Sequence, residues 1–186
     1  MKAVCYGDSN TFGYDPSGYL GGRYDHPWHE ILEVKTGWDV VNEGMNGREI
    51  ASTSVSFPED LDLLIIMLGS NDLLQLRTPE AACEKMGHFL ESLTLDRGKI
   101  LLIAPPPMKF GQWVQDQEPI DNSIKLAKCY IALDERRSGY SSCLRRRTPN
   151  RRGPQSLRQG TDRIFTQRRI NYVGNWLEST GIYAER

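Results

Sequence analysis

Short apolar runs alternate with longer segments of helical periodicity along this chain. The apolar runs predict strands over 2–6, 40–42, 61–68 and 100–104. The helical spacing predicts helices over 28–35, 79–93 and 120–133, with a closing helix over 164–177. Strands that alternate with helices are typical of a parallel sheet with right-handed crossovers. We therefore expect an α/β protein, a three-layer α/β/α sandwich around a mainly parallel sheet, with an irregular C-terminal part.

The helix expected from residue 79 has the clearest start signal. Thr78 suits the N-cap, Pro79 suits the first helical position, and Glu80 favours the first turn. Its apolar positions, which we expect to be buried, are Cys83, Met86, Phe89, Leu90 and Leu93. The closing helix is predicted because four apolar residues share one face, namely Ile170, Val173, Trp176 and Leu177.

Three predicted strands run into small or polar residues. Gly7-Asp8-Ser9-Asn10 follows the first strand, Asn46-Gly47-Arg48 follows the second, and Gly69-Ser70-Asn71-Asp72 follows the third. The carboxyl ends of parallel strands meet at one edge of a sheet, where ligands collect. The three segments offer an attacking oxygen, an approachable backbone N–H and an amide donor, which acyl transfer requires. Taken alone, the first segment is equally typical of a capped turn.

These three segments resemble the first three sequence blocks of the SGNH (GDSL) hydrolases, a family of esterases and lipases. Residues 101–107, an apolar strand running into three prolines, are similar to bacterial arylesterase-like members. The resemblance covers about residues 1–133 and implies the flavodoxin-like SGNH hydrolase fold. It also implies that Ser9 is the nucleophile. The oxyanion hole would then combine the backbone N–H groups of Ser9 and Gly47 with the Asn71 side chain.

The resemblance implies a serine esterase that hydrolyses small acyl esters, such as acetylated sugars or aryl acetates. It implies no metal and no organic cofactor. The expected partner is therefore a small-molecule ester. The sequence leaves homo-oligomerisation open.

The fourth block of the family, Asp-x-x-His near the C-terminus, is absent here. Its histidine is the general base that activates the serine. The chain has three histidines, His26, His29 and His88, and none follows residue 88. Asp162 is followed three residues later by Phe165, which is either a decayed relic of the block or a coincidence. A serine without a base is a weak nucleophile, so we expect impaired activity. The alternative is a non-catalytic domain that binds esters or carbohydrates.

The charge balance changes abruptly after residue 134. Residues 1–134 carry 11 lysines and arginines against 20 acidic residues. Residues 135–186 carry 12 arginines, no lysine and 4 acidic residues. This tail is a frame-shifted translation, a diverged segment, or a basic patch for nucleic acid or membrane. Because charge runs usually form solvated or disordered segments, we expect no nucleic-acid and no membrane partner.

The chain length of 186 residues suits one domain. We expect residues 1–134 to match the family and residues 135–186 to form an atypical arginine-rich tail. The longest apolar stretch, 63–68, is too short to cross a membrane, and the first strand begins at once, without a signal peptide. Scattered cysteines without metal or disulfide spacing fit the cytoplasm; they are Cys5, Cys83, Cys129 and Cys143.

Several further residues have two interpretations each. We expect Asp72 to cap a helix or orient its loop rather than to act as an acid or base. We interpret residues 25–29, which hold His26 and His29, as a surface loop and a helix start rather than as catalytic. His88 is expected to be exposed. Trp113 lies in a long loop after the prolines, where it forms either a wall or lid of the substrate pocket or a plain surface.

Overall fold

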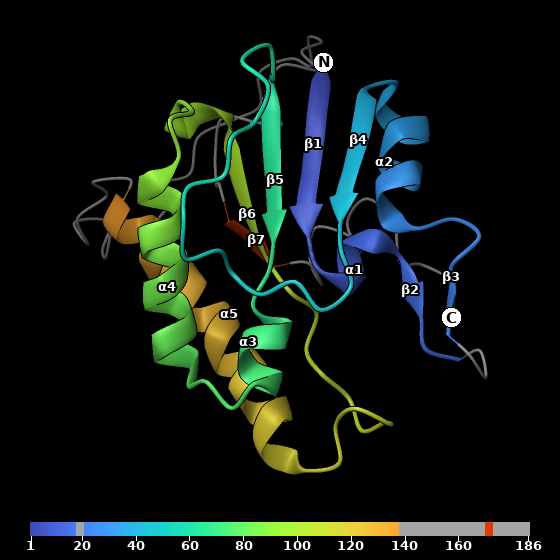
Figure 1. Ribbon diagram of the computed structural model, residues 1–186, viewed down its shortest axis with the longest axis vertical. Helices are drawn as coiled ribbons and strands as arrows, with labels where there is room; N and C mark the ends of the chain where they lie inside the picture. The colour runs from blue at the N-terminus through green and yellow to red at the C-terminus, as the bar shows by residue number, and fades with distance from the viewer. Residues whose placement is uncertain (18–20, 138–169, 173–186) are drawn as a thin grey trace, which may run out of the picture.

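A parallel sheet forms the centre of the protein, seen in a computed structural model that describes residues 1–17, 21–137 and 170–172. In this part of the chain the sheet has five strands in the order β4-β1-β5-β6-β7 (Figure 1). The strands are β1 (Lys2–Gly7), β4 (Asp39–Gly44), β5 (Leu63–Met67), β6 (Ile100–Ala104) and β7 (Ile170–Tyr172). Taken in chain order their arrangement is 2-1-3-4-5, the flavodoxin-like order. The predicted fold class is confirmed.

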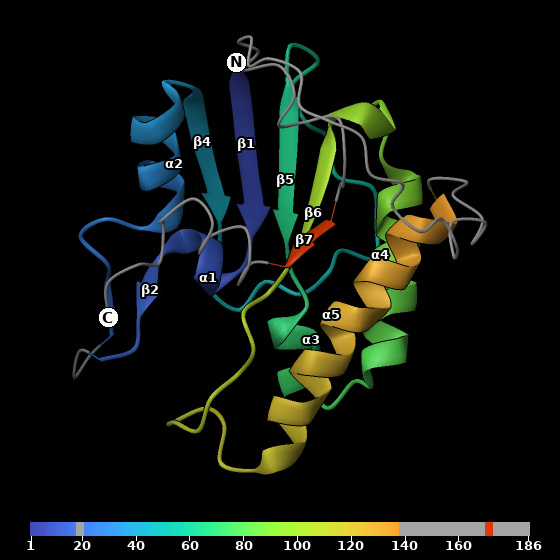
Figure 2. The same ribbon diagram turned by 180° about the vertical axis from the view of Figure 1, so that it is seen from behind.

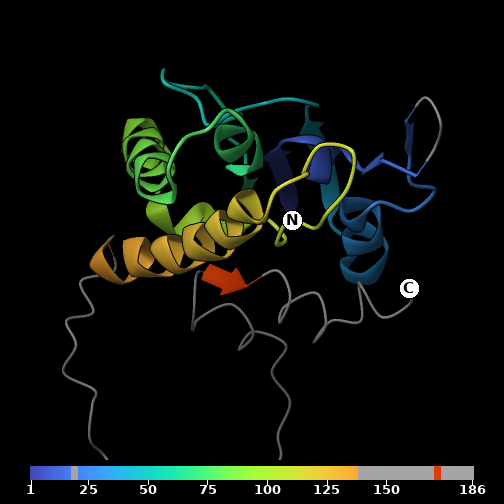
Figure 3. The ribbon, with the colours of Figure 1, turned by 90° about the horizontal axis from the view of Figure 1, so that it is seen from below.

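Helices cover both faces of the sheet. The helices are α1 (Ser9–Phe12), α2 (Trp28–Thr36), α3 (Ser70–Leu74), α4 (Pro79–Ser92) and α5 (Gln117–Arg137), with a 3-10 turn at Arg97–Lys99. Viewed toward the carboxyl ends of the strands, α4 and α5 lie on one side and α2 on the other (Figure 3). A separate antiparallel pair joins β2 (Tyr14–Asp15) to β3 (Gly22–Arg23). No helix in the described ranges has the length and apolar character needed to cross a bilayer.

The hydrophobic core consists of two clusters, one on each face of the sheet. Successive side chains of a strand point to opposite faces. In β1, Val4 and Tyr6 therefore join the cluster under α4 and α5, whereas Ala3 and Cys5 join the cluster under α2. All five residues of β5 are buried. Burial on both faces explains why this strand appears in the sequence as an uninterrupted apolar run.

Helix α4 confirms the predicted start and buried face. The Thr78 hydroxyl accepts a hydrogen bond from the Ala81 N–H at 3.2 Å, and Pro79 occupies the first turn. All five positions predicted to be buried are buried. The helix packs against α5, whose Tyr130 is completely buried and donates its hydroxyl to the Leu68 carbonyl oxygen at 3.0 Å.

Strand β7 corrects the prediction for the C-terminal region. A helix was predicted over 164–177, but residues 170–172 form a strand that pairs in parallel with β6 (Figure 2). Unpaired backbone groups on a buried strand edge are costly, and β-branched and aromatic residues suit a strand, so pairing outweighs helical spacing here. The rest of the predicted helix lies outside the described residues, as does Asp162.

Candidate active site

The loops that follow β1, β4 and β5 meet at the carboxyl edge of the sheet. Gly7 stands in register with both Gly44 and Met67, so the three strands end at the same level. The strand order reverses between β1 and β5, and ligands of open α/β sheets bind at such a switch point. Ser9 follows β1 at this point, and Asn71 follows β5.

Ser9 is the first residue of α1. Asp8 caps this helix: its Oδ1 accepts the Asn10 backbone N–H at 2.9 Å and the Asn10 side-chain N–H at 3.0 Å. Ser9 itself is half-buried, and its hydroxyl makes no hydrogen bond to another described residue. The cap therefore fixes the backbone around Ser9 and leaves its hydroxyl unengaged within the described part of the chain.

Two glycines allow α1 to lie directly against the strand ends. A Cβ atom on Gly7 would stand 2.0 Å from Thr11 Oγ1 and 2.6 Å from the Met67 carbonyl oxygen. A Cβ atom on Gly44 would stand 2.2 Å from the Phe12 nitrogen. Only residues without a side chain permit so close an approach. The glycine of the Gly-Asp-Ser segment is thus required by packing.

The loop after β4 is fastened to the end of β1. Gly7 O accepts hydrogen bonds from the Met45 N–H and from Arg48 Nη1, each at 3.1 Å. The Arg48 guanidinium also lies 4.2 Å from the centre of the Tyr6 ring. Between these contacts the chain turns at Gly47, which is exposed and has φ +76°. The Gly47 backbone is therefore held in the left-handed region, beside the segment that carries Ser9.

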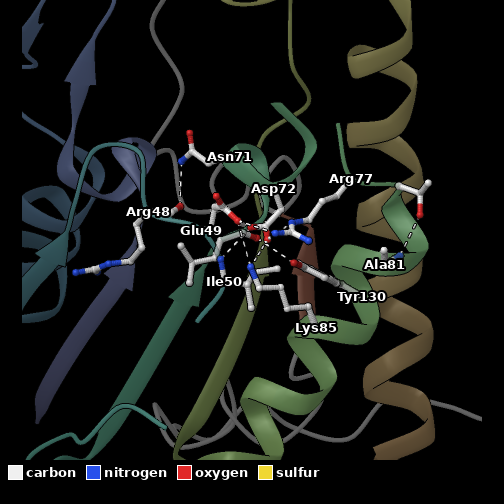
Figure 4. Close-up of polar contacts among 11 residues, drawn as sticks. Arg48, Glu49, Ile50, Asn71, Asp72, Arg77, Ala81, Lys85 and Tyr130 are labelled. Carbon is white, nitrogen blue, oxygen red and sulfur yellow. Dashed lines mark hydrogen bonds and ion pairs between the residues drawn. The ribbon is translucent and has the colours of Figure 1, made fainter. Parts of the chain in front are cut away.

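Helix α3 is bonded to both of the other loops. Asn71 Nδ2 donates to the Arg48 carbonyl oxygen at 3.0 Å, and Figure 4 shows its side chain directed at that loop. Asn10 Nδ2 donates to Ser70 Oγ at 3.2 Å. The structure thus brings together the three segments that carry Ser9, Gly47 and Asn71.

Asp72 is completely buried and orients the loop after Gly47. Its Oδ2 accepts the Ile50 N–H at 2.9 Å, and its Oδ1 accepts from Lys85 Nζ at 2.9 Å (Figure 4). Asp72 was predicted to cap a helix or orient its own loop; its side chain instead bonds the backbone of another loop, the one after β4. Lys85 was not predicted as part of the site. One signal existed: Lys85 lies three residues after Ala82 and four before Phe89, both of which are buried, and so shares their helix face.

The described histidines do not supply a base to Ser9. His29 belongs to α2 and is buried, where its Nε2 accepts from Arg23 Nη2 and Asn42 Nδ2, each at 3.0 Å. Two donors on Nε2 require a neutral ring, and burial together with Arg23 lowers the pKa of His29. His26 and His88 are exposed. Among the described residues, no histidine forms a hydrogen bond with Ser9.

Residues 25–29 form the expected loop and helix start, with Asp25 and His26 exposed and α2 beginning at Trp28, but His29 is buried. This burial has a local cause in α2. Trp28 Nε1 donates to the Asn10 carbonyl oxygen at 3.1 Å, which draws the start of α2 against α1. His29 follows into the interior and ties α2 to β4 through Asn42. Its role within the described chain is thus a structural one.

Trp113 remains a residue with two interpretations. It lies in a tight turn in which Gly111 and Val114 exchange backbone hydrogen bonds. The exposed fractions of Trp113 and Phe110 are 65% and 64%, so this turn presents two aromatic rings to solvent.

Within the described ranges, no group of three or more histidine, cysteine or acidic side chains is placed to hold a metal ion.

Known proteins resemble this arrangement. The profile of the GDSL-like Lipase/Acylhydrolase family matches residues 5–154. A search of curated proteins finds no match. The native aryl esterase of M. smegmatis is 25% identical with a TM-score of 0.61, over 74% of this chain and 81% of that one. A carbohydrate acetylesterase family member from Sinorhizobium meliloti is 25% identical with a TM-score of 0.59, over 73% and 79%.

Proposed function

Because the chain belongs to the GDSL-like lipase/acylhydrolase family, we propose that it is a serine esterase acting on small carboxylic esters. One observation carries the proposal. Ser9, with a hydroxyl unengaged by other described residues, lies on a loop bonded to the loops of Gly47 and Asn71 at the switch point of the sheet. The names of the two similar structures, an aryl esterase and a carbohydrate acetylesterase, support an aryl or acetyl ester as substrate.

In the proposed reaction, Ser9 Oγ attacks the carbonyl carbon of the ester and its proton passes to a base. The carbonyl oxygen becomes an oxyanion, and the alcohol leaves as the acyl-enzyme forms. Water then attacks the acyl group, which releases the acid and restores Ser9. Splitting one difficult step into two easier ones is the advantage of covalent catalysis.

The oxyanion is stabilised by the backbone N–H groups of Ser9 and Gly47 and by the Asn71 side chain. An asparagine amide has two N–H bonds on Nδ2. One of the two is directed to the Arg48 carbonyl oxygen, and the other remains for the oxyanion. Donors that are already held in place before the reaction cost no reorganisation when the charge develops, which makes such holes effective.

A second function is favoured by one specific observation. No histidine forms a hydrogen bond with Ser9 among the described residues. A site that has the nucleophile and the oxyanion donors but no base would bind esters or carbohydrates while turning them over slowly. Catalysis remaining after loss of a triad member is about 10³–10⁴ over water, owing to the hole and to binding. We therefore expect at most weak esterase activity from this chain.

A fluorophosphonate probe, which reacts with activated serines, tests the proposal. The wild-type protein should be labelled at Ser9, and Ser9→Ala should abolish labelling and hydrolysis of nitrophenyl acetate. Ser17→Ala, which removes an exposed hydroxyl elsewhere, is the matched control and should be labelled like the wild type. Labelling that persists in Ser9→Ala would exclude Ser9 as the nucleophile. A wild-type protein that is not labelled would favour the binding domain.

A further inference from the structure

A buried ion pair lies directly behind the loop that carries Gly47. Asp72 of α3 and Lys85 of α4 meet at 2.9 Å, and the Asp72 side chain is 0% exposed while that of Lys85 is 18% exposed. Figure 4 shows the Lys85 side chain and the backbone of Ile50, three residues beyond Gly47, both directed at the Asp72 carboxylate. The pair thus joins two helices to the loop after β4.

The contacts of Asp72 are divided between its two oxygens. Oδ1 accepts from the Lys85 ammonium, and Oδ2 accepts the backbone N–H of Ile50 at 2.9 Å. Hydrogen bonds to a charged acceptor are short and directional. Because the Ile50 N–H belongs to the main chain, this bond fixes the position of the loop's backbone. A contact with a side chain of the loop would not fix it.

Stability alone does not explain a buried charge pair at this place. An apolar pair of the same volume is often as stable or more stable, because taking two charges out of water is costly. One side of the pair faces apolar residues of the core: Ile50, Leu73 and Phe89 are all buried there. The charge pair provides a directed bond to the Ile50 N–H, and an apolar pair would not provide one.

Lys85 has a second acidic partner on the same loop. Its ammonium donates to Glu49 Oε2 at 3.2 Å, and this hydrogen bond lowers the pKa of Glu49. Arg77 also contacts both acids, at 3.3 Å from Glu49 and 3.7 Å from Asp72. However, the Arg77 side chain is 47% exposed, and such pairs contribute little. Lys85 is therefore the principal cation of the cluster.

A cavity of about 330 Å³ opens beside the pair and gives Lys85 its contact with solvent. Its wall includes Arg77, Lys85 and His88. Lys85 lines this cavity, whereas the Asp72 carboxylate has no exposed surface. The lysine is thus partly exposed while it holds the buried acid.

We propose that Lys85 is a positioning residue. Through Asp72 and the Ile50 N–H it holds the loop that carries Gly47 in a fixed position relative to Asn71. This inference rests on the proposed function, since it matters for catalysis only if Gly47 and Asn71 bind the oxyanion. Without the ammonium, the buried Asp72 keeps only the more distant and half-exposed Arg77 as a cationic partner, and the loop shifts away from its present position. Displacing a catalytic group by about 1 Å can cost on the order of 100-fold in rate.

Three variants separate positioning from stability. Lys85→Met removes the ammonium and retains the length of the side chain, whereas Lys85→Arg retains a cation. Lys99→Met is the matched control, because Lys99 is a half-buried lysine whose Nζ donates to the Leu61 carbonyl oxygen at 2.7 Å, at the amino end of the sheet. We expect kcat and the rate of fluorophosphonate labelling to fall about 10- to 100-fold in Lys85→Met. KM should change little, Lys85→Arg should recover most of the loss, and Lys99→Met should keep the wild-type rate.

A readout independent of activity is the hydrogen exchange of the Ile50 amide, followed by NMR. Its protection should fall in Lys85→Met and be kept in Lys85→Arg and Lys99→Met. If the wild type is not labelled at all, the proposed esterase function fails. Exchange of the Ile50 amide still tests whether Lys85 holds the loop in place. Unchanged Ile50 protection in Lys85→Met, or lost protection with an unchanged labelling rate, would overturn the inference.

A fourth variant guards against loss of folding. Lys85→Gln has a neutral amide that can donate to Asp72, so it leaves the acid with a partner. If Lys85→Met does not fold, the labelling rate of Lys85→Gln is measured instead. It should be lower than the rates of Lys85→Arg and Lys99→Met, by less than about tenfold. A rate equal to that of the wild type would count against Lys85.

Discussion

Asn71 Nδ2 and the carbonyl oxygen of Arg48 are joined by a hydrogen bond of 3.0 Å between α3 and the loop after β4. Because only the nitrogen of an amide side chain can donate, this bond determines which way the Asn71 amide points. It also means that the loop of Gly47 and the side chain of Asn71 move together. The two sets of proposed oxyanion donors thus form one mechanical unit.

Loss of the Asn71 amide should lower kcat. Removing one side-chain donor from an oxyanion hole costs about 10²–10³ in kcat, so Asn71→Ala should lose about that factor with little change in KM. The measurement is steady-state hydrolysis of nitrophenyl acetate. Asn122→Ala, which removes from α5 a half-buried amide whose oxygen accepts from Lys125 Nζ, serves as the control and should keep the wild-type kcat. An effect on KM alone would show that Asn71 only binds the ground-state substrate.

Exogenous imidazole should accelerate the reaction of Ser9. A serine lacking its general base is weakly nucleophilic, and a small base in solution can take the proton instead. We expect the rate of fluorophosphonate labelling to rise with imidazole concentration in the wild type. Ser9→Ala measures the direct reaction of imidazole with the reagents. A wild-type rate that is already high and insensitive to imidazole would show that a base reaches Ser9 within the protein.

The gene sequence should settle the origin of the arginine-rich tail. If residues after about 134 are a frame-shifted translation, another frame should encode Asp-x-x-His within an amphipathic C-terminal pattern. The protein with that tail restored should hydrolyse esters far faster than the 186-residue chain. Absence of the motif from every frame, together with rapid turnover by the present chain, would contradict this prediction. His26, His29 or a partner subunit would then have to supply the base.

Gly7→Ala should destabilise the fold. The added methyl group would collide with Thr11 Oγ1 and with the Met67 carbonyl oxygen, and such overpacking typically costs about 1–3 kcal/mol. Gly22→Ala is the matched control, since a Cβ atom there has no neighbour within 4 Å. Its free energy of unfolding should stay within about 0.5 kcal/mol of wild type. Urea denaturation measures both, and equal stabilities would refute the close packing of α1 on the strand ends.

Asp8 should make stability fall as the pH rises through weakly acidic values. Burial raises the pKa of Asp8 to about 6. The unfolded chain loses this proton near pH 4, so between about pH 4 and 6 the folded state binds more protons and its free energy of unfolding decreases. Asp8→Asn retains an oxygen for the Asn10 N–H and does not titrate.

The difference between wild type and Asp8→Asn reports this titration alone. The stability of the wild type relative to the variant should be highest below about pH 4 and should decline by on the order of 3 kcal/mol by about pH 7. Urea denaturation at several pH values provides the measurement. A difference that does not vary with pH would mean that Asp8 keeps an ordinary pKa.

Elements with a strong local signal could be predicted from the sequence. Strand β5 is buried on both faces, so its apolar run is uninterrupted. Helix α4 combines a Thr78 cap, a proline in the first turn and a regular buried face. In the same way, the glycine, serine and asparagine that end the strands reached one edge because parallel strands align their carboxyl ends.

Elements that depend on partners distant in the sequence could not be predicted. Helices α1 and α3 are only four and five residues long, and they form because the glycines Gly7 and Gly44 allow close packing and because bonds join them to other loops. The pairing of Lys85 with Asp72 requires knowing that α4 lies against α3. For the same reason, β7 was predicted as a helix, since only the edge of β6 makes residues 170–172 a strand.

Strand β7 also imposes an order of events during synthesis. Its partner β6 is complete at residue 104, and 68 residues separate this end from Tyr172. At a synthesis rate of about 5–20 residues per second, roughly 3–14 seconds pass between the two. Throughout that interval the growing chain presents the unpaired edge of β6, which is a template for pairing with another nascent chain. Translation speed over this stretch should therefore influence how much protein reaches the folded state and how much is lost to aggregation.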